Sequence, residues 1–555
     1  MLSFRSAVVA ALTLSSATLR TPIAAQADAP IIYSDDRTAA STIHDRDPGY
    51  RPTYLVYADT QRTLDQGKKL VEALGLPAHL QEYKTRVYVV GPRNGRAYDG
   101  TADLAEYQNF LRTHRSSNLK IIGVGAGATF VNNVVAKHAF SVAGILTYGG
   151  TVEKGSASSM PVPAYVHAAD PAVARQYRDA NGATAKTDSA DWTTYANPAA
   201  GQALQQVVVS RRDDANENLA RAFENAWRSV FSRNYRLYMT LIESYAPGFD
   251  PNNYTDPWEL EPYVMYDELG MRYEAITEDV PDIGSTLRYE YVPRSVLTAA
   301  PRTVPLVVMM HGNNNDSRVQ GESSGWPEIA AKQNIILTSI EWQGRTTQEK
   351  IVFPAIGERG TMAVLDRVLA KYPQIDPSRV YLTGLSAGAM NSFVYGLNNI
   401  SRIAAVEGSS APFGPPAMMD AAEKLKGRGT YLPVYSIAGT HDMYKPLPVN
   451  DTPRSFYNVI RAFALVNDIA VPDAPDLKVN ELFGLKFPEQ AWGTLGGTRA
   501  MIGTLSNKDG VTMKFVGLDP YGHWNFKPAA ADMWVFLAQF RRDLTTGKLQ
   551  RVSGR

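Results

Sequence analysis

The stretch YLTGLSAGAM, from Tyr381 to Met390, decides the predicted fold. It places a Gly-x-Ser-x-Gly pattern, Gly384 to Gly388, directly after an apolar run typical of a strand and before a run typical of a helix. Such a turn holds its serine in a strained backbone conformation at the top of a sheet, and the small flanking residues let helix and strand approach each other. Because a bare Gly-x-Ser-x-Gly also occurs by chance, its partners along the chain must decide its meaning.

Two later loops supply partners for Ser386. Asp442 follows the predicted strand LPVYSIAG, and His523 follows the predicted strand TMKFVGL. The chain order serine, acid, histidine is that of α/β-hydrolases. We therefore expect His523 to accept the proton of Ser386 and Asp442 to hold the imidazole in the useful tautomer. Asp519 is a weaker candidate for the acid, because it precedes the loop of His523 and lies very close to it in sequence.

The loop after the predicted strand PLVVMM is the candidate for half of an oxyanion hole. In this fold, backbone N–H groups from that loop and from the residue after the nucleophile stabilise the negative oxygen. We favour the N–H of Asn313, with Asn314 as the alternative, together with the N–H of Ala387. In the same loop, His311 is expected to make structural hydrogen bonds rather than to transfer a proton.

Two tryptophans are candidates for the substrate site. Trp342 ends the strand that follows the oxyanion loop, and Trp524 adjoins His523. Either ring could line an apolar or aromatic acyl or polymer site. Ordinary core packing is the alternative for both, and we favour it slightly for Trp342. The predicted substrate-site residues are His311, Asn314, Trp342 and Trp524.

Strand-like and helix-like runs alternate along the chain, which predicts an α/β fold. The chain has 555 residues, more than the roughly 250–300 at which a single core stops growing. We therefore predict two α/β-hydrolase-like lobes, each a mostly parallel sheet covered by helices on both faces. Residues 443–510 form either a cap or an ordinary sheet-covering segment. The predicted segments are 1–27 (signal peptide), 50–246 (first lobe), 247–270 (linker) and 271–548 (second lobe).

The first lobe carries a degenerate copy of the serine turn. NLKIIGVGAGATF, at 118–130, matches SRVYLTGLSAGAM, at 378–390, with Gly125 in the position of Ser386. The match predicts an internal duplication whose first copy is catalytically silent. A nucleotide-binding loop is a weaker interpretation, because the glycines give G-x-G-x-G and no P-loop lysine follows. The expected roles of this lobe are structural support, dimerisation or one wall of the active-site cleft.

Composition excludes several classes of protein. The net charge is +1, so nothing indicates nucleic acid or an anionic membrane as a partner. Arg5, the apolar run at 7–14 and the triplet ending at Ala27 predict a cleaved export signal, too short to span a bilayer, and hence a secreted or periplasmic protein. Cysteine is absent, which excludes disulfides and thiolate chemistry. No metal or cofactor is implied, and a homo-oligomer is left open.

The second lobe, about Arg272 to Leu544, resembles the polyhydroxybutyrate-depolymerase-type esterases, which are close to secreted feruloyl and acetylxylan esterases. The resemblance is carried by PLVVMMHG, IDPSRVYLTGLSAGAM, AGTHD and GHW. Relatives commonly have cysteine after the His-Gly pair, where this chain has NNND, and here a long segment follows AGTHDMYKPLP. The resemblance implies an α/β-hydrolase fold and a serine esterase with the triad Ser386, Asp442 and His523, but no particular substrate.

Three functions are compatible with these residues. The first is an exported serine esterase that hydrolyses a polyester, aryl or acetyl ester through an acyl enzyme, with a small-molecule or polymeric ester as its partner. The second is a peptidase or amidase with the same triad. The third is a non-catalytic protein that binds a polymer or carbohydrate on a hydrolase scaffold.

Overall fold

The structure is a computed structural model of the 555-residue chain. The predicted signal peptide, residues 237–259 of the connecting region, and Asn314 lie outside the described residues. The described residues are 31–37, 52–83, 85–114, 118–139, 142–154, 161–167, 170–198, 205–212, 217–236, 260–262, 264–313, 315, 317–346 and 351–552.

The N-terminal lobe is built on a nine-stranded sheet in the order β1-β3-β2-β4-β5-β6-β9-β8-β7. The strands from β3 to β9 in this order are parallel, whereas β1, β8 and β7 run antiparallel to their neighbours. In chain order the strands are β1 (Ile31–Asp36), β2 (Thr53–Tyr57), β3 (Arg86–Val90), β4 (Leu119–Val124), β5 (Val142–Tyr148), β6 (Ala164–His167), β7 (Ala185–Asp188), β8 (Trp192–Ala196) and β9 (Gln206–Ser210).

The C-terminal lobe is built on a ten-stranded sheet in the order β12-β13-β15-β14-β18-β19-β20-β23-β22-β21. Here β15 to β23 are parallel, and the two strands at each end are antiparallel to their neighbours. The strands are β12 (Met271–Val280), β13 (Gly284–Pro293), β14 (Val304–Met310), β15 (Ile336–Ile340), β18 (Ile375–Gly384), β19 (Ala405–Ser409), β20 (Val434–Gly439), β21 (Glu489–Leu495), β22 (Thr498–Ser506) and β23 (Thr512–Leu518).

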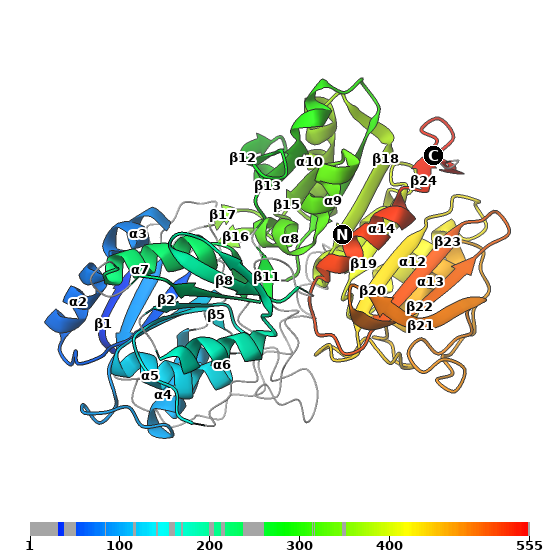
Figure 1. Ribbon diagram of the computed structural model, residues 1–555. Coiled ribbons are helices and arrows are strands. Elements are labelled where there is room, and N and C mark those ends of the chain that lie inside the picture. The colour runs from blue at the N-terminus through cyan, green and yellow to red at the C-terminus, as the bar shows by residue number, and fades with distance from the viewer. Residues whose placement is uncertain are drawn as a thin grey trace.

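Helices cover both faces of each sheet (Figure 1). On the N-terminal sheet, one face carries α2 (Leu64–Ala73), α3 (Leu76–Tyr83), α7 (Leu219–Ala226) and the π-helical η3 (Trp227–Phe231), and the other carries α4 (Ala102–His114), α5 (Ala126–Asn133), η2 (Val135–His138) and α6 (Pro171–Asn181). On the C-terminal sheet, one face carries α10 (Gly357–Lys371), α11 (Ala387–Asn398), α12 (Pro416–Leu425) and α13 (Tyr457–Val466), and the other carries α8 (Ser317–Ser323), α9 (Trp326–Gln333), η8 (Lys527–Ala529) and α14 (Ala530–Leu537). The predicted fold class is confirmed.

The central strands explain why the sequence shows unbroken apolar runs. In β14, Leu306 and Val308 contribute to the core under α10–α13, whereas Val307 and Met309 contribute to the core under α9 and α14. Successive side chains of a strand point to opposite faces, so a strand covered on both faces must be apolar at every position. Helix α13 packs into the first of these cores beside α12, so this part of residues 443–510 covers the sheet.

The two sheets share one topology. Read from β1 and from β13, the two orders correspond strand by strand, and each neighbouring pair has the same relative direction in both lobes. Only β12 of the C-terminal sheet lacks a counterpart among the described residues. The internal repeat predicted from the serine turn therefore extends over nine strands.

Three local features lie outside the predicted bounds or the simple alternation of strands and helices. The N-terminal sheet begins with β1, before the predicted boundary at residue 50. After η3 ends at Phe231 the chain continues as β10 (Asn234–Arg236), which pairs with β11 (Leu260–Pro262) inside the predicted linker. The last helix ends at Leu537, and β24 (Phe540–Arg542) follows, paired with β25 (Leu549–Arg551). This extended backbone lets the buried Arg542 donate to the carbonyls of Ile403, at 2.7 Å, and Tyr431, at 2.9 Å.

Candidate functional site

Ser386 lies in a tight turn between β18 and α11. Its backbone has φ 55° and ψ −116°, a left-handed region that costs a non-glycine residue free energy of the order of 1–3 kcal/mol. Glycines make the turn possible, because a Cβ on Gly388 would overlap the carbonyl of Met310 and one on Gly384 would overlap Gly388. Ser386 is 9% exposed, and its hydroxyl has no hydrogen-bond partner among the described residues. The local geometry is that of the predicted nucleophile elbow.

Asp442 and His523 are hydrogen bonded to each other. Nδ1 of His523 lies 2.8 Å from Oδ2 of Asp442, whose side chain is fully buried. The second oxygen, Oδ1, accepts the backbone N–H of Tyr444 at 2.8 Å. The ring of Tyr444 packs edge-on against the imidazole at 4.7 Å between centroids. The carboxylate is thus held on both oxygens, and the bond to Nδ1 leaves Nε2 as the ring nitrogen of His523 that does not face Asp442.

Backbone contacts bring the loop of His523 to the serine turn. The N–H of Ser386 donates to the carbonyl of Ser409 at 2.9 Å, and the hydroxyl of the next residue, Ser410, donates to the carbonyl of Trp524 at 3.2 Å. Asn525, two residues after His523, is buried and donates to the hydroxyl of Ser323 in α8 at 2.8 Å. The loop is therefore fixed on both sides. Sequence reasoning missed Asn525 and Tyr444, and only their proximity to the predicted residues could have indicated them.

The predicted oxyanion loop borders Ser386. A Cβ placed on Gly312 would lie 3.4 Å from the Cβ of Ser386. The side-chain oxygen of the next residue, Asn313, accepts a hydrogen bond from Gln343. Ala387 is the first residue of α11, where a backbone N–H has no acceptor within the helix. The start of α11, with the N–H of Ala387, and the loop that carries the N–H of Asn313 thus both border Ser386, and their role as an oxyanion hole stays a prediction.

The other predicted substrate-site residues have different positions. His311 is fully buried and makes structural hydrogen bonds, and a substrate contact for it stays a prediction. Trp342 donates from Nε1 to the carbonyl of His311 at 2.8 Å and packs on its ring. Trp524 packs partly against the core beneath α14. A substrate contact for either tryptophan stays a prediction, and Asn314 lies outside the described residues.

The rejected candidate for the acid is engaged elsewhere. Asp519 accepts from the hydroxyl of Thr440 at 2.7 Å and from the guanidinium of Arg499 at 2.6 Å. Its two oxygens therefore link the turn after β23 to the end of β20 and to the start of β22. This arrangement agrees with the choice of Asp442 from the sequence.

The matching turn of the N-terminal lobe has the same backbone conformation, but a carboxylate lies beside it. Gly125 has φ 55° and ψ −115°, within one degree of Ser386. The carboxylate of Asp59 accepts the N–H of Ala126 at 2.9 Å, the counterpart of the Ala387 N–H. A Cβ on Gly125 would overlap this carboxylate. The position that corresponds to the oxyanion is thus filled by a side chain of the lobe itself.

A buried polar cluster lies where the second and third catalytic loops would be. Glu217, in the loop after β9, lies 2.9 Å from Nδ1 of His167 at the end of β6, and both side chains are fully buried. Tyr165 and Asn225 donate to Glu217 at 2.6 and 2.7 Å, and Ser210 also donates to it. Burial alone would raise the pKa of Glu217, but these partners outweigh it and lower the pKa to about 2.

The lowered pKa of Glu217 predicts acid sensitivity of the N-terminal lobe. A carboxyl whose pKa is lower in the folded state stabilises the protein above its unfolded pKa and loses this contribution as pH falls. Here the contribution, about 3 kcal/mol, should be complete above pH ~4.5 and decline toward pH ~2. Thermal unfolding at pH 7 and pH 3.5 should show that Glu217→Gln is destabilised at pH 7 and closer to the wild type at pH 3.5. Equal destabilisation at both values would contradict this.

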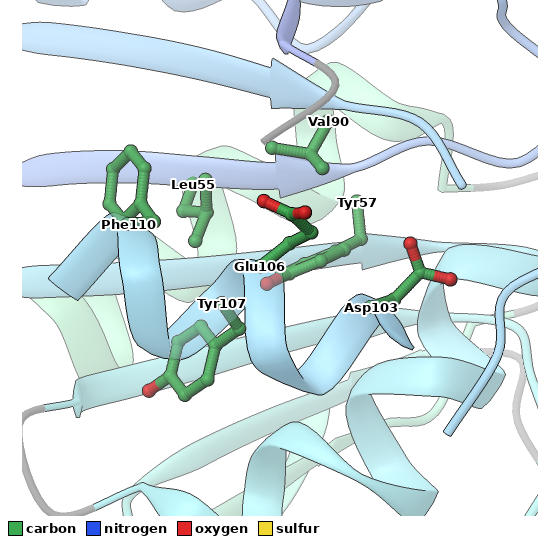
Figure 2. A pocket seen from close by; sticks show the side chains of 7 residues that line it. All are labelled: Leu55, Tyr57, Val90, Asp103, Glu106, Tyr107 and Phe110. Atoms are coloured by element: carbon green, nitrogen blue, oxygen red, sulfur yellow. The ribbon is translucent and has the colours of Figure 1, made fainter. Parts of the chain in front are cut away.

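The N-terminal lobe also contains a small cavity between α4 and the sheet. Figure 2 shows its lining, in which the carboxylate of Glu106 projects among the side chains of Tyr57 and Val90. Its volume is about 10 Å³, close to what a single water molecule needs. One carboxylate oxygen of Glu106 is buried there without a protein partner, while the other pairs with Arg93. The cavity is too small for an organic substrate.

The chain has distant likenesses among known proteins. No protein-family model matches the sequence, and neither does any curated protein. Among solved structures, an acetyl xylan esterase from Aspergillus awamori is 16% identical, with 48% of this chain and 98% of that chain covered and a TM-score of 0.33. An S-formylglutathione hydrolase from Agrobacterium tumefaciens is 11% identical, with 48% and 95% covered and a TM-score of 0.32. An esterase from Pyrobaculum calidifontis is 15% identical, with 33% and 72% covered and a TM-score of 0.24.

The strand order, and not these likenesses, defines the fold, because all three TM-scores lie below 0.5. A mixed sheet with a serine turn after β18, a carboxylate after β20 and a histidine after β23 is the α/β-hydrolase fold. No helix in the described part of the chain combines the length and apolar character needed to cross a bilayer. Within the same residues, no group of three or more histidine, aspartate or glutamate side chains is placed to hold a metal ion.

Proposed function

We propose that this chain is a serine esterase whose nucleophile is Ser386, whose general base is His523 and whose orienting acid is Asp442. The observation that carries the proposal is the hydrogen bond between His523 and Asp442 at 2.8 Å, in a lobe that also holds Ser386 in a strained elbow conformation. Strain in a non-glycine residue persists only where the surrounding structure enforces it, and such strain clusters at active sites.

The proposed reaction proceeds through an acyl enzyme. The oxygen of Ser386 attacks the ester carbonyl carbon while its proton passes to Nε2 of His523. The N–H groups of Asn313 and Ala387 hold the resulting oxyanion. Collapse of the tetrahedral intermediate expels the alcohol, which takes the proton from His523. Water then attacks the acyl enzyme, again with His523 as base, and the acid leaves with Ser386 restored.

The proposed substrate is a carboxylic ester of a polyester, an aryl ester or an acetyl ester. The sequence motifs of the C-terminal lobe support this substrate class, because they resemble those of polyhydroxybutyrate-depolymerase-type and feruloyl esterases. We also propose that the protein is exported, on the basis of the signal sequence at 1–27. The N-terminal lobe is proposed to be catalytically silent for two reasons. Gly125 has no side chain to act as a nucleophile, and Asp59 binds the N–H of Ala126, which corresponds to the proposed oxyanion donor Ala387.

A substrate panel tests the proposal. Purified protein should release p-nitrophenol from short acyl esters and ferulic or acetic acid from model esters, more rapidly than it cleaves aminoacyl p-nitroanilides. Faster cleavage of the anilides would favour a peptidase or amidase that uses the same three residues. A protein that cleaves neither class and takes no label from a serine-directed fluorophosphonate would favour a non-catalytic binding protein.

A further inference from the structure

We propose that the buried pair His311–Glu341 polarises the peptide bond between Gly312 and Asn313 and thereby strengthens the oxyanion donor. His311 and Glu341 are then positioning residues, since they act on the substrate only through this peptide. The inference rests on the proposed function and extends it to residues without contact to substrate.

The ring of His311 lies between two oxygen acceptors. Its Nδ1 is 2.7 Å from the carbonyl oxygen of Gly312, and its Nε2 is 3.0 Å from Oε1 of Glu341. A carbonyl can only accept, so Nδ1 must carry a hydrogen and donate it. On its other side the ring is hydrogen bonded through Nε2 to the carboxyl group of Glu341. Both side chains are fully buried, where the low local dielectric strengthens such bonds.

The bond to Gly312 acts on the oxyanion hole through one peptide unit. The carbonyl of Gly312 and the N–H of Asn313 belong to the same amide group, next to Ser386. A hydrogen bond accepted by the amide oxygen draws electron density toward that oxygen and makes the N–H a stronger donor, as in cooperative hydrogen-bond chains. The N–H of Asn315 also donates to this carbonyl, at 3.0 Å, which adds to the effect.

The N-terminal lobe shows that the fold does not require this pair. Met310 is paired with Ile340 across β14 and β15, as Tyr57 is paired with Val90 across β2 and β3. The residues that follow are His311 and Glu341 in one lobe and Ala58 and Gly91 in the other. The same strands are therefore built without the pair in the lobe that has glycine at the nucleophile position. The requirement for the pair is local to the turn that holds Ser386.

Trp342 keeps the pair in place. Its indole N–H donates to the backbone carbonyl of His311 at 2.8 Å, and its ring faces the imidazole at 5.4 Å between centroids. The ring of His311 is consequently fixed by Glu341, by Gly312 and by Trp342.

The test compares Glu341→Gln and His311→Gln with the wild type on p-nitrophenyl acetate. We expect kcat to fall about tenfold for Glu341→Gln and about tenfold to a hundredfold for His311→Gln, less than the 10²–10³ of a lost donor. KM should stay within about twofold. A trifluoromethyl ketone, whose adduct with serine carries an oxyanion, should bind more weakly by the same factor as kcat/KM falls, because both report the charged oxygen.

The matched control is Glu217→Gln, which removes the carboxylate of the other buried histidine–glutamate pair, in the N-terminal lobe. It should lower the unfolding temperature and leave kcat and the inhibitor affinity unchanged. If Glu341→Gln folds and keeps its kcat and inhibitor affinity, while wild-type turnover depends on Ser386, this inference is overturned and the proposed function is not. A wild type without Ser386-dependent turnover would overturn the proposed function and this inference with it. If His311→Gln does not fold, the isosteric Glu341→Gln decides.

Discussion

Replacement of Ser386 by alanine should lower kcat for ester hydrolysis by about 10⁴–10⁶-fold, the range seen when a serine hydrolase loses its nucleophile. The hydroxyl forms the covalent bond to the acyl group, and the described residues offer no second nucleophile at the turn, where the flanking residues are Leu385 and Ala387. Burst and steady-state release of p-nitrophenol, together with labelling by a fluorophosphonate, measure the loss. Folding should be unaffected, because removing the hydroxyl breaks no hydrogen bond described here.

Ser392→Ala is the matched control for this prediction. Ser392 lies on the same helix, is fully buried and donates only to the carbonyl of Gly388, at 2.9 Å. Its replacement should leave kcat within about threefold of the wild type, since a buried helix serine contributes about 1 kcal/mol to stability rather than to the reaction. Turnover that persists in Ser386→Ala at the wild-type level would show that the chemistry lies elsewhere in the chain.

The central strands could be predicted from the sequence because they are buried on both faces. Strands such as β14 and β20 are buried throughout and mostly apolar, and turn residues bound them, so each gives a clear signal. The edge hairpins β7–β8 and β21–β22 could not be predicted in the same way. The side chains of β7 are all exposed, and those of β21 are mostly exposed. Such strands depend on backbone pairing with the sheet, which leaves no apolar pattern.

The residues around the serine turn were predictable where a motif fixes them, and unpredictable where the fold brings distant side chains together. Ser386, Asp442 and His523 each follow a strand, and chain order supplies their roles. Glu341 contacts His311 because the pairing of β14 with β15 brings their two loops together. No spacing pattern in the sequence predicts this contact. Asp59 is a similar case, because its hydrogen bond is with the N–H of Ala126, 67 residues further along the chain, and the sequence does not show that the two are close.

The two lobes separate what the fold needs from what the chemistry needs. Both turns keep the same backbone angles, and in both a glycine, Gly127 or Gly388, lies close to the carboxyl end of the neighbouring strand in the sheet, β2 or β14. Those features therefore belong to the packing of helix on sheet. The C-terminal lobe has the hydroxyl of Ser386 and the N–H of Ala387, which has no acceptor among the described residues, whereas the N-terminal lobe has Asp59 in their place. A nucleotide-binding loop, the weaker interpretation of this sequence, is not needed to explain the glycines of the N-terminal lobe.

Replacement of Asp442 by asparagine should lower kcat by about 10⁴-fold at neutral pH with little change in the fold. The carboxylate accepts from Nδ1 of His523 and so leaves Nε2 unprotonated and able to take the proton of Ser386. An asparagine amide can donate to Nδ1 instead, which places the hydrogen on Nε2 and removes the base. The amide oxygen can still accept the N–H of Tyr444, so the loop should keep its shape. Steady-state kinetics and thermal unfolding separate the two effects.

Asp519→Asn is the control that distinguishes this tautomer effect from a general loss of negative charge near His523. Asp519 lies four residues before His523, but its oxygens are bound to Thr440 and Arg499. The variant should keep kcat within about threefold of the wild type and lose at most about 1 kcal/mol of stability, because the ion pair with Arg499 is exposed. A loss in Asp519→Asn as large as in Asp442→Asn would make Asp519 the orienting acid and refute the pairing of Asp442 with His523 in catalysis.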